Sequence, residues 1–384
     1  MEPFDTSSDS PHPPYGGLTN ARILKFTCIL ILLLLLRNCF DSEEQPAEEP
    51  DSTATDSAII QVEMAEPKPL GATYGPPTPQ TLWQETDNPK VFMPTGSGRV
   101  QSAHYGSVRT QRSGRASFHE GVDIAPTVWS RGRAQDEIFA VNDGKVAYIN
   151  RVGGNSSYGI YIVLEHEDPL GSVYTLYAHM ASVTKSLRAD DPVQRGDSLG
   201  VMGHSSTLGI PRQRSHLHFE LCLMLNPEFN RWYRSKKLTP NHQRYHGYNL
   251  VGLNPHFLLS QLHEREETRF SFEQALEQTQ RAWTILIKTP RKPNYFSHYK
   301  DLWQGPAPQY GAIVLDVSES GVILAGRSAS SEQSQELGTK KTMILDVDTE
   351  ALGRNGVRHI QKISGRWQLR SNGDRWLEIL LYRP

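Results

Sequence analysis

The chain has 384 residues, and its 37% hydrophobic and 21% charged fractions are typical of globular proteins, which excludes a chain that is disordered throughout. A length of this size favours two domains. The formal charge is −2, but residues 41–67 hold nine acidic residues and no Lys or Arg, so the rest of the chain carries a formal charge of +7. This excess is small and spread out, which suits either an anionic polymer or an ordinary surface, and we expect no nucleic-acid partner.

An apolar run covers residues 26–36, with Arg22 and Lys25 before it and Arg37 directly after it. A positive flank followed by an apolar core is typical of an export signal. The run is shorter than the roughly 20 residues of a membrane-spanning helix. We therefore assign residues 1–40 to a cytoplasmic N-terminus with an export signal or membrane anchor.

The fate of this segment stays open between three alternatives. A cleaved signal would need an Ala-x-Ala site, and none follows closely. A short anchoring helix is compatible with Lys25 and Arg37, because long basic side chains reach back to the membrane surface. A lipid on Cys39 is the third alternative, although Arg37 departs from the usual lipoprotein signal. Each alternative places the rest of the chain outside the cytoplasm, in the periplasm or at the cell surface.

The cysteines limit the types of metal ligand that this chain can offer, and the tract after Cys39 has the composition of a linker. Cys28, Cys39 and Cys222 form no Cys-x-x-Cys motif and no readable disulfide framework, so a metal site would have to use His and carboxylate ligands. Residues 41–80 are rich in Glu, Asp, Pro, Ser and Thr, and such a composition predicts a disordered linker.

Residues 81–265 show short apolar runs with turn signals between them. This spacing predicts a mainly β domain with an antiparallel β core. The expected strands are 137–141, 144–149, 159–164, 172–177, 198–202 and 216–221.

Residues 270–384 contain no motif that carries chemistry, and we interpret them as a small C-terminal α+β domain of unknown role. A helix is expected over 272–288, and the polar stretch 328–341 is expected to be a loop. Strands are expected at 312–315, 322–325, 343–345 and 376–381.

Three short motifs contain residues that can bind a metal: His119-Glu-Gly-Val-Asp123, Tyr177-Ala-His179 and His216-Leu-His218. Residues two apart in a strand share a face, so His216 and His218 project together. Gly121 lets the chain bend and direct His119 and Asp123 to one point. Two His and one Asp suit zinc better than magnesium and leave a fourth position open, as in catalytic zinc sites.

The stretch from about residue 94 to 221 resembles the M23 peptidases of the lysostaphin type. Order and approximate spacing both agree with the family. The resemblance runs through Tyr105-Gly106, Arg109, Phe118-His-Glu-Gly-Val-Asp-Ile124, Gly144-Lys-Val146, Tyr158-Gly159, His166, Thr175-Leu-Tyr-Ala-His-Met180, Val193-Gln-Arg-Gly196, Gly200-Val-Met-Gly203 and Ser215-His-Leu-His-Phe-Glu220.

The resemblance implies a peptidase domain with a barrel-sandwich hybrid fold and a single zinc ion. His119, Asp123 and His218 would coordinate the metal. His216 and His179 would stand beside the attacking water, and we favour His216 as the base and His179 as the group that stabilises the transition state, although the sequence does not separate these two roles.

The implied substrate is peptidoglycan, cut at its peptide cross-links or stems. The alternative is a non-enzymatic protein that binds the cell wall and activates other wall hydrolases, since some relatives have lost their metal ligands. All five expected positions are intact here, which favours the enzyme. Processing of a secreted protein is a third and weaker alternative.

Other basic residues are assigned smaller roles. Arg109, Arg212 and Arg214 are candidates for contacts with substrate carboxylates. His166 is expected to be structural. His242 and His246 are four apart, but Gln243 stands where the helical metalloprotease motif has Glu, so we assign this pair to an insertion.

Overall fold

The computed structural model of this protein describes residues 71–110, 116–239, 241–353 and 359–384. All of them belong to one compact unit, Pro67–Pro384. The apolar run, Cys39 and residues 41–70 of the predicted linker lie outside the described residues. Within the described ranges, no helix has both the length and the apolar character needed to cross a membrane.

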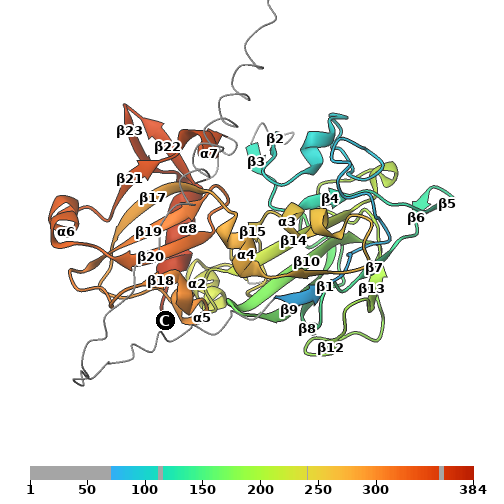
Figure 1. Ribbon diagram of the computed structural model, residues 1–384, viewed down its shortest axis with the longest axis horizontal. Helices are drawn as coiled ribbons and strands as arrows, with labels where there is room; N and C mark the ends of the chain where they lie inside the picture. Colours follow the sequence, from blue (N-terminus) through green and yellow to red (C-terminus); the bar gives the residue numbers. More distant parts are fainter. Residues whose placement is uncertain (1–70, 111–115, 240, 354–358) are drawn as a thin grey trace, which may run out of the picture. The chain divides into compact units, whose positions relative to one another are not determined.

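The predicted antiparallel β core is confirmed. Its main element is a seven-stranded antiparallel sheet in the order β12-β8-β9-β10-β14-β15, with β4 pairing with β14 off this path (Figure 1). The strands are β4 (Val122–Ile124), β8 (Gly144–Asn150), β9 (Ile160–Asp168), β10 (Gly171–Met180), β12 (Pro192–Val193), β14 (Leu217–Met224) and β15 (Leu250–Leu253).

Smaller sheets and short helices surround this sheet. A three-stranded sheet has the order β11-β13-β7 and carries two of the predicted strands. Its members are β11 (Ser182–Val183), β13 (Ser198–Val201) and β7 (Glu137–Phe139). The other pairs are β2 (Val108–Thr110) with β3 (Ala116–Phe118), β5 (Trp129–Ser130) with β6 (Arg133–Ala134), and β1 (Ala72–Tyr74) with β16 (Thr268–Phe270). The helices are η1 (Val100–Ala103), η2 (Arg212–Arg214), α2 (Phe229–Ser235), α3 (His256–Leu259) and η3 (Ser260–Leu262).

The C-terminal residues form the expected α+β arrangement. A five-stranded sheet has the order β18-β20-β19-β17-β21, and a hairpin of β22 and β23 follows it. The strands are β17 (Arg281–Lys288), β18 (Trp303–Gln304), β19 (Ala312–Ser318), β20 (Ile323–Ser328), β21 (Thr342–Val347), β22 (Ile360–Ile363) and β23 (Arg366–Leu369). The helices are α4 (Phe272–Glu277), α5 (Tyr295–His298), η4 (Lys300–Leu302), α6 (Ser331–Leu337), α7 (Thr349–Gly353) and α8 (Ser371–Leu381).

Three element predictions in this region were wrong. The helix expected over 272–288 ends at Glu277, and 281–288 is strand β17, which lies between two other strands and is buried on both faces. The strand expected at 376–381 is the last part of α8, because Trp376, Ile379 and Leu380 are buried at helical spacing. The loop expected over 328–341 contains α6, which begins with a capping box at Ser330.

The last ten residues of the predicted linker, 71–80, are folded in the structure and not disordered as expected. Tyr74 is fully buried, and β1 pairs with β16 in antiparallel register. Residues 71–80 are therefore part of the folded unit. The division into a peptidase domain at 81–265 and a C-terminal domain at 270–384 stays a prediction from the sequence, since one hydrophobic core includes residues of both ranges.

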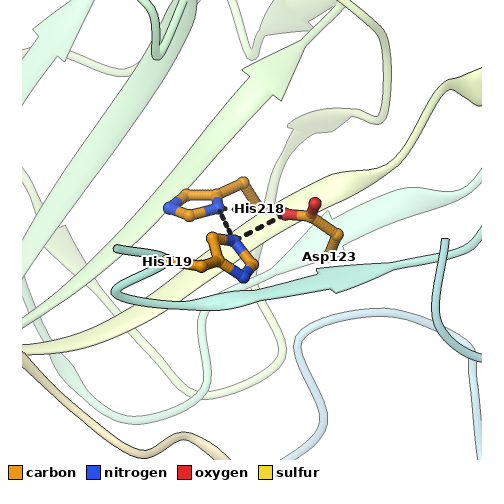
Figure 2. Close-up of side chains that lie close together, drawn as sticks. All are labelled: His119, Asp123 and His218. Carbon is orange, nitrogen blue, oxygen red and sulfur yellow. Dashed lines mark hydrogen bonds and ion pairs between the residues drawn. The ribbon is translucent and has the colours of Figure 1, made fainter. Parts of the chain in front are cut away.

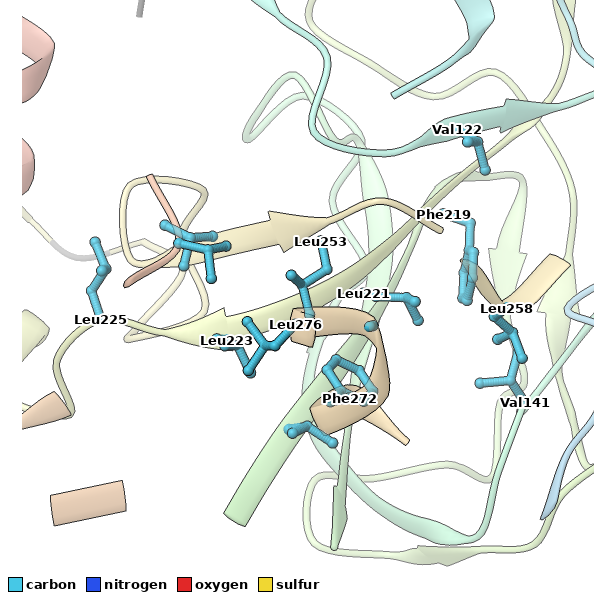
Figure 3. Close-up of a cluster of buried hydrophobic side chains, with 14 of the residues drawn as sticks. Val122, Val141, Phe219, Leu221, Leu223, Leu225, Leu253, Leu258, Phe272 and Leu276 are labelled. Atoms are coloured by element: carbon cyan, nitrogen blue, oxygen red, sulfur yellow. The ribbon is translucent and has the colours of Figure 1, made fainter. Parts of the chain in front are cut away.

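Strand β14 has two different faces. Phe219, Leu221 and Leu223 enter the main hydrophobic core, where Leu253 and Phe272 are among their neighbours (Figure 3). On the opposite face, Cys222 and Met224 belong to a second apolar cluster that Tyr245 and Leu250 complete. His218 and Glu220 share that face by strand alternation. The polar end of this face is where the candidate site forms.

The C-terminal helix α8 is fastened to the end of β14 by one buried amide. Asn226 Nδ2 donates hydrogen bonds to the carbonyl oxygens of Ile379 and Tyr382, at 2.7 and 2.8 Å. Asn226 is fully buried, so water cannot replace it as a donor. This contact fixes α8 relative to the main sheet.

We expect Asn226→Ala to lower the free energy of unfolding by roughly 2–4 kcal/mol, because the carbonyl oxygens of Ile379 and Tyr382 both lose a hydrogen bond from a buried donor. Chemical denaturation of the full chain measures this change. Asn372→Ala, which truncates an exposed amide on α8, serves as the control and is expected to change the unfolding free energy by at most about 0.5 kcal/mol. Equal stability of the two variants would contradict the role assigned to Asn226.

Candidate metal centre

The pairing of β4 with β14 brings two of the predicted ligands together. Asp123 and His218 are directly opposite each other in the antiparallel register, and opposite residues have adjacent side chains. The turn before β4 carries His119, and Gly121 lies so close to β14 that an added Cβ would be 2.4 Å from the carbonyl oxygen of Phe219. Glycine is therefore required where His119 approaches the strand.

His179 reaches the same place by a local distortion of β10. The pairing of β10 with β9 shifts register between Tyr177 and Met180, and His179 has a φ of 59°, in the left-handed region that non-glycine residues rarely adopt. A bulge of this kind turns a side chain away from its regular direction. Strained backbone conformations of this type are common at functional sites, which makes His179 a stronger candidate.

The three predicted ligands converge (Figure 2). His119 Nε2 lies 3.0 Å from Asp123 Oδ1 and 3.0 Å from His218 Nδ1, and His218 Nδ1 lies 3.0 Å from the same Asp123 oxygen. All three side chains are buried. Within the described residues, these three form a group whose ligand atoms are close enough to share one metal ion.

Hydrogen bonds to the outer ring nitrogens show that this group fits a cation. His119 Nδ1 lies 2.9 Å from the carbonyl oxygen of His104, and His218 Nε2 lies 2.6 Å from Glu220 Oε1. Both oxygens are acceptors, so the outer nitrogens carry the protons and the inner nitrogens keep their lone pairs. Two lone pairs and a carboxylate oxygen then face one another, and a cation between them removes their repulsion.

The charges around the group support the same interpretation. Burial would raise the pKa of Asp123, but Arg109, His119 and His216 lower it well below its usual range. Burial and then Arg109 lower the pKa of His119 to about 4. Burial also acts to lower the pKa of His218, but its hydrogen bonds to Asp123 and Glu220 raise that pKa to about 9. One positive charge, a proton or a metal ion, is thus expected between Asp123 and His218.

His216 and His179 lie beside the three ligands. The ring centroids of these two residues are 4.9 Å apart, and His179 is 5.7 Å from the ring of His218. His216 Nε2 lies 3.6 Å from Asp123 Oδ1. The structure therefore brings together all five residues that the sequence singles out for metal binding and proton transfer.

The three candidate arginines lie in different surroundings. Arg109 Nη2 donates to Asp123 Oδ2 at 2.6 Å, so its guanidinium is already engaged by one of the predicted ligands. Arg214 Nε donates to the carbonyl oxygen of Pro94 at 2.9 Å. Arg212 is exposed on η2 and lines a separate pocket.

One residue behind His218, Glu220, was not assigned a role from the sequence. Glu220 accepts hydrogen bonds from the Tyr158 hydroxyl at 2.9 Å and from the Cys222 thiol at 3.2 Å, besides its contact with His218. Glu220 is two residues beyond His218 on the same face of β14. Strand alternation was therefore a signal that could have identified it.

A cavity of about 580 Å³ opens on this site. His119, His179 and His218 are among the residues that line it, together with residues of the 155–158 and 241–248 segments and of α8. His242 and His246 are thus in the wall of the same cavity, not on a separate helix. His166 lies elsewhere, between the carbonyl oxygen of Asp143 and the Thr175 hydroxyl.

Comparison with known protein families addresses the resemblance inferred from the sequence. Residues 117–227 match peptidase family M23. The predicted resemblance is confirmed for this segment, which includes the five converging residues. Comparison with curated proteins gives no match.

Several solved structures resemble part of the chain. Csd3 of Helicobacter pylori has 19% identity and a TM-score of 0.23, over 39% of this chain and 30% of that protein. The lysostaphin catalytic domain of Staphylococcus simulans has 23% identity and a TM-score of 0.23, over 31% of this chain and 75% of that domain. The catalytic domain of EnpA from Enterococcus faecalis has 21% identity and a TM-score of 0.21, over 30% of this chain and 78% of that domain.

Proposed function

We propose that this protein is a zinc-dependent endopeptidase that hydrolyses peptide bonds in the cross-links or stems of peptidoglycan. The observation that carries this proposal is the convergence of His119, Asp123 and His218 beside two further histidines, within a segment that matches the M23 family. We place the protein outside the cytoplasm, in the cell envelope, where peptidoglycan is found.

The three converging side chains would hold one zinc ion through His119 Nε2, Asp123 Oδ1 and His218 Nδ1. A bound zinc ion lowers the pKa of a water molecule toward neutrality and polarises the carbonyl group of the peptide bond to be cut. The ligands can bind the metal only if the inner ring nitrogens of His119 and His218 keep their lone pairs. The carbonyl oxygen of His104 and the carboxylate of Glu220 ensure this by holding the outer nitrogens of the two rings.

His216 is suited to accept a proton. Its Nδ1–H donates to the carbonyl oxygen of Arg214 at 2.7 Å, which leaves a lone pair on Nε2. Burial lowers the pKa of His216, so the ring is neutral at neutral pH. We expect Nε2 to take a proton from the attacking water and then to donate it to the leaving amine.

His179 has the same pattern of bonds. Its Nδ1–H donates to the carbonyl oxygen of Ser205 at 2.9 Å, and burial, with His216 and His218, lowers its pKa well below the usual range. We propose that His179 takes up a second proton, from solvent, as negative charge develops on the carbonyl oxygen, and that its Nε2–H then donates to that oxygen.

The decisive experiment is digestion of purified peptidoglycan by the full chain, followed by mass analysis of the released fragments. Fragments that differ by hydrolysis of one peptide bond are expected, and their masses identify the bond. Binding to peptidoglycan without release of fragments would instead favour the non-enzymatic regulator of other hydrolases.

The contribution of Glu220 to zinc binding, through its hydrogen bond with His218, can be measured separately. We expect Glu220→Gln to weaken zinc binding by roughly 10- to 100-fold, because the charged acceptor that orients His218 is lost. A competition titration with a chelator measures the zinc affinity. Glu165→Gln on β9, which is separated from β14 by β10, is the matched control, since Glu165 pairs with Lys145 and not with the ligands. Unchanged zinc affinity in Glu220→Gln would remove Glu220 from the site.

A further inference from the structure

The cavity of the metal centre continues to a part of the chain that lies outside the segment matching the M23 family. Part of its lining, which we call the α8 end, is a group of residues in mutual contact: Tyr233, His242, His246, Tyr248, Asn372 and Arg375. Every one of these residues comes after residue 227, where the family match stops. The α8 end is therefore an addition to the peptidase segment that shares its cavity.

Arg375 brings a positive charge to this end without a carboxylate partner. Its guanidinium lies over the ring of Tyr248, 4.4 Å from the ring centroid, and Nη1 makes one long hydrogen bond to Asn372 Oδ1 at 3.4 Å. The nearby carboxylate of Glu378 is 2.5 Å from Lys236 Nζ. Among the described residues, Arg375 forms no ion pair, so its remaining N–H groups can bind an anion.

His246 adds a neutral donor beside this charge. The backbone N–H of Tyr248 donates to His246 Nδ1 at 3.0 Å, which places the ring proton on Nε2. Burial, and then the proximity of His242 and Arg375, lowers the pKa of His246 to about 4. The ring is therefore uncharged at neutral pH, and its Nε2–H can donate to an acceptor in the cavity.

The α8 end is held rigidly to the metal centre. The 241–248 segment packs so closely on Tyr158 that a Cβ on Gly247 would be 2.9 Å from the Tyr158 hydroxyl. That hydroxyl donates to Glu220, which in turn contacts His218. On the other side, Asn226 and the indole of Trp376, which donates to the Gly321 carbonyl oxygen, fix α8. A ligand at Arg375 would thus lie at a fixed position relative to the metal ligands.

We propose that the α8 end of the cavity is a subsite for a free carboxylate group on the peptide substrate, held by Arg375 with Tyr248 and His246 as supporting contacts. The subsite selects peptides whose carboxylate lies away from the bond to be cut. This inference rests on the proposed function in one respect only, namely that the ligand is a peptide.

The test compares two ligands that differ only in charge. The probes are acetylated Gly-Gly-Ala-Ala with a free C-terminal carboxylate and the same peptide with a C-terminal amide. NMR titration measures both dissociation constants on the zinc-loaded full chain, which carries His216→Ala so that the probes are not cleaved. We expect roughly tenfold tighter binding of the acid, as for a charge-assisted bidentate contact, and a ratio near one when Arg375→Met is added.

Two further variants make the result specific. Arg366→Met removes an exposed arginine from β23 and is expected to keep the preference for the acid. Arg375→Lys keeps the charge but loses the planar fork, so an intermediate ratio is expected, and this variant replaces Arg375→Met if the latter does not fold. A preference for the acid that survives in both Arg375 variants would overturn the proposal, as would the absence of any preference in the chain with Arg375 intact.

Failure of the subsite and failure of the peptidase can be told apart. Release of peptidoglycan fragments by the native chain, without a preference for the acid probe, would leave the peptidase standing and reject the subsite. A preference that depends on Arg375, without release of fragments, would leave a carboxylate-binding site on a protein that does not cut peptidoglycan.

Discussion

Replacement of His218 by alanine is expected to reduce the zinc content from about one ion per chain to near zero and to abolish peptidoglycan hydrolysis. His218 Nδ1 is 3.0 Å from both other ligand atoms, so its removal leaves one histidine and one carboxylate to hold the metal. A two-residue set does not meet the three protein ligands of a catalytic zinc site. Elemental analysis of the purified protein measures the metal content directly.

The control for this prediction has to separate metal loss from unfolding. His218→Ala also leaves the buried carboxylate of Glu220 without its partner, which lowers stability. His218→Gln keeps a donor for Glu220, and circular dichroism shows whether each variant is folded. His263→Ala changes a histidine whose Nδ1 accepts from the backbone of Gln84 and should retain the full zinc content. A folded His218 variant with about one zinc per chain would show that His218 is not a ligand.

His216→Ala, unlike His218→Ala, is expected to keep the zinc ion while losing peptidoglycan hydrolysis. His216 Nε2 is 3.6 Å from Asp123 Oδ1, near the ligands, but His216 is not a member of the converging set. Loss of a positioned proton acceptor lowers kcat by roughly 10²- to 10⁴-fold. The rate of fragment release at saturating peptidoglycan and the zinc content of the same sample measure both effects.

A second buried histidine serves as the comparison for His216. His166 is also buried and has its pKa lowered to about 4 by burial, but it contacts Asp143 and Thr175 away from the site. His166→Gln is expected to reduce stability while leaving kcat within about twofold of the native value, because none of its contacts reaches the reacting groups. Native kcat in folded His216→Ala would exclude His216 as the base.

The same measurements of rate and zinc content on His179→Ala test which ring is the proton acceptor and which stabilises the transition state. If His216 is the base, its removal should eliminate the acid limb of the pH–rate profile, whereas His179→Ala should lower the rate at every pH. The reverse pattern would exchange the two roles.

Four strands of the main sheet, β8, β9, β10 and β14, were predictable because short apolar runs are separated there by turn signals. In β14, leucine and phenylalanine alternate with His218 and Glu220, and the two sets enter different surroundings in the structure. The same reasoning failed for β17, whose apolar run was joined to the helical pattern that begins at Phe272, although α4 ends at Glu277. It also failed for α8, whose apolar residues were assigned to a short strand although they are spaced for a helix.

The sequence by itself determined the β class of the main domain and the histidines and aspartate that can bind a metal, since these depend on composition, local periodicity and motif order. The export signal stays a prediction from the sequence. Only the tertiary structure decided which atoms of His119, Asp123 and His218 face one another, and that Glu220 holds the outer nitrogen of His218. It also decided that Arg375 lies in the cavity of the metal centre. These contacts join residues that are far apart in the chain, or, for Glu220 and His218, depend on the direction of side chains that strand alternation only places on one face.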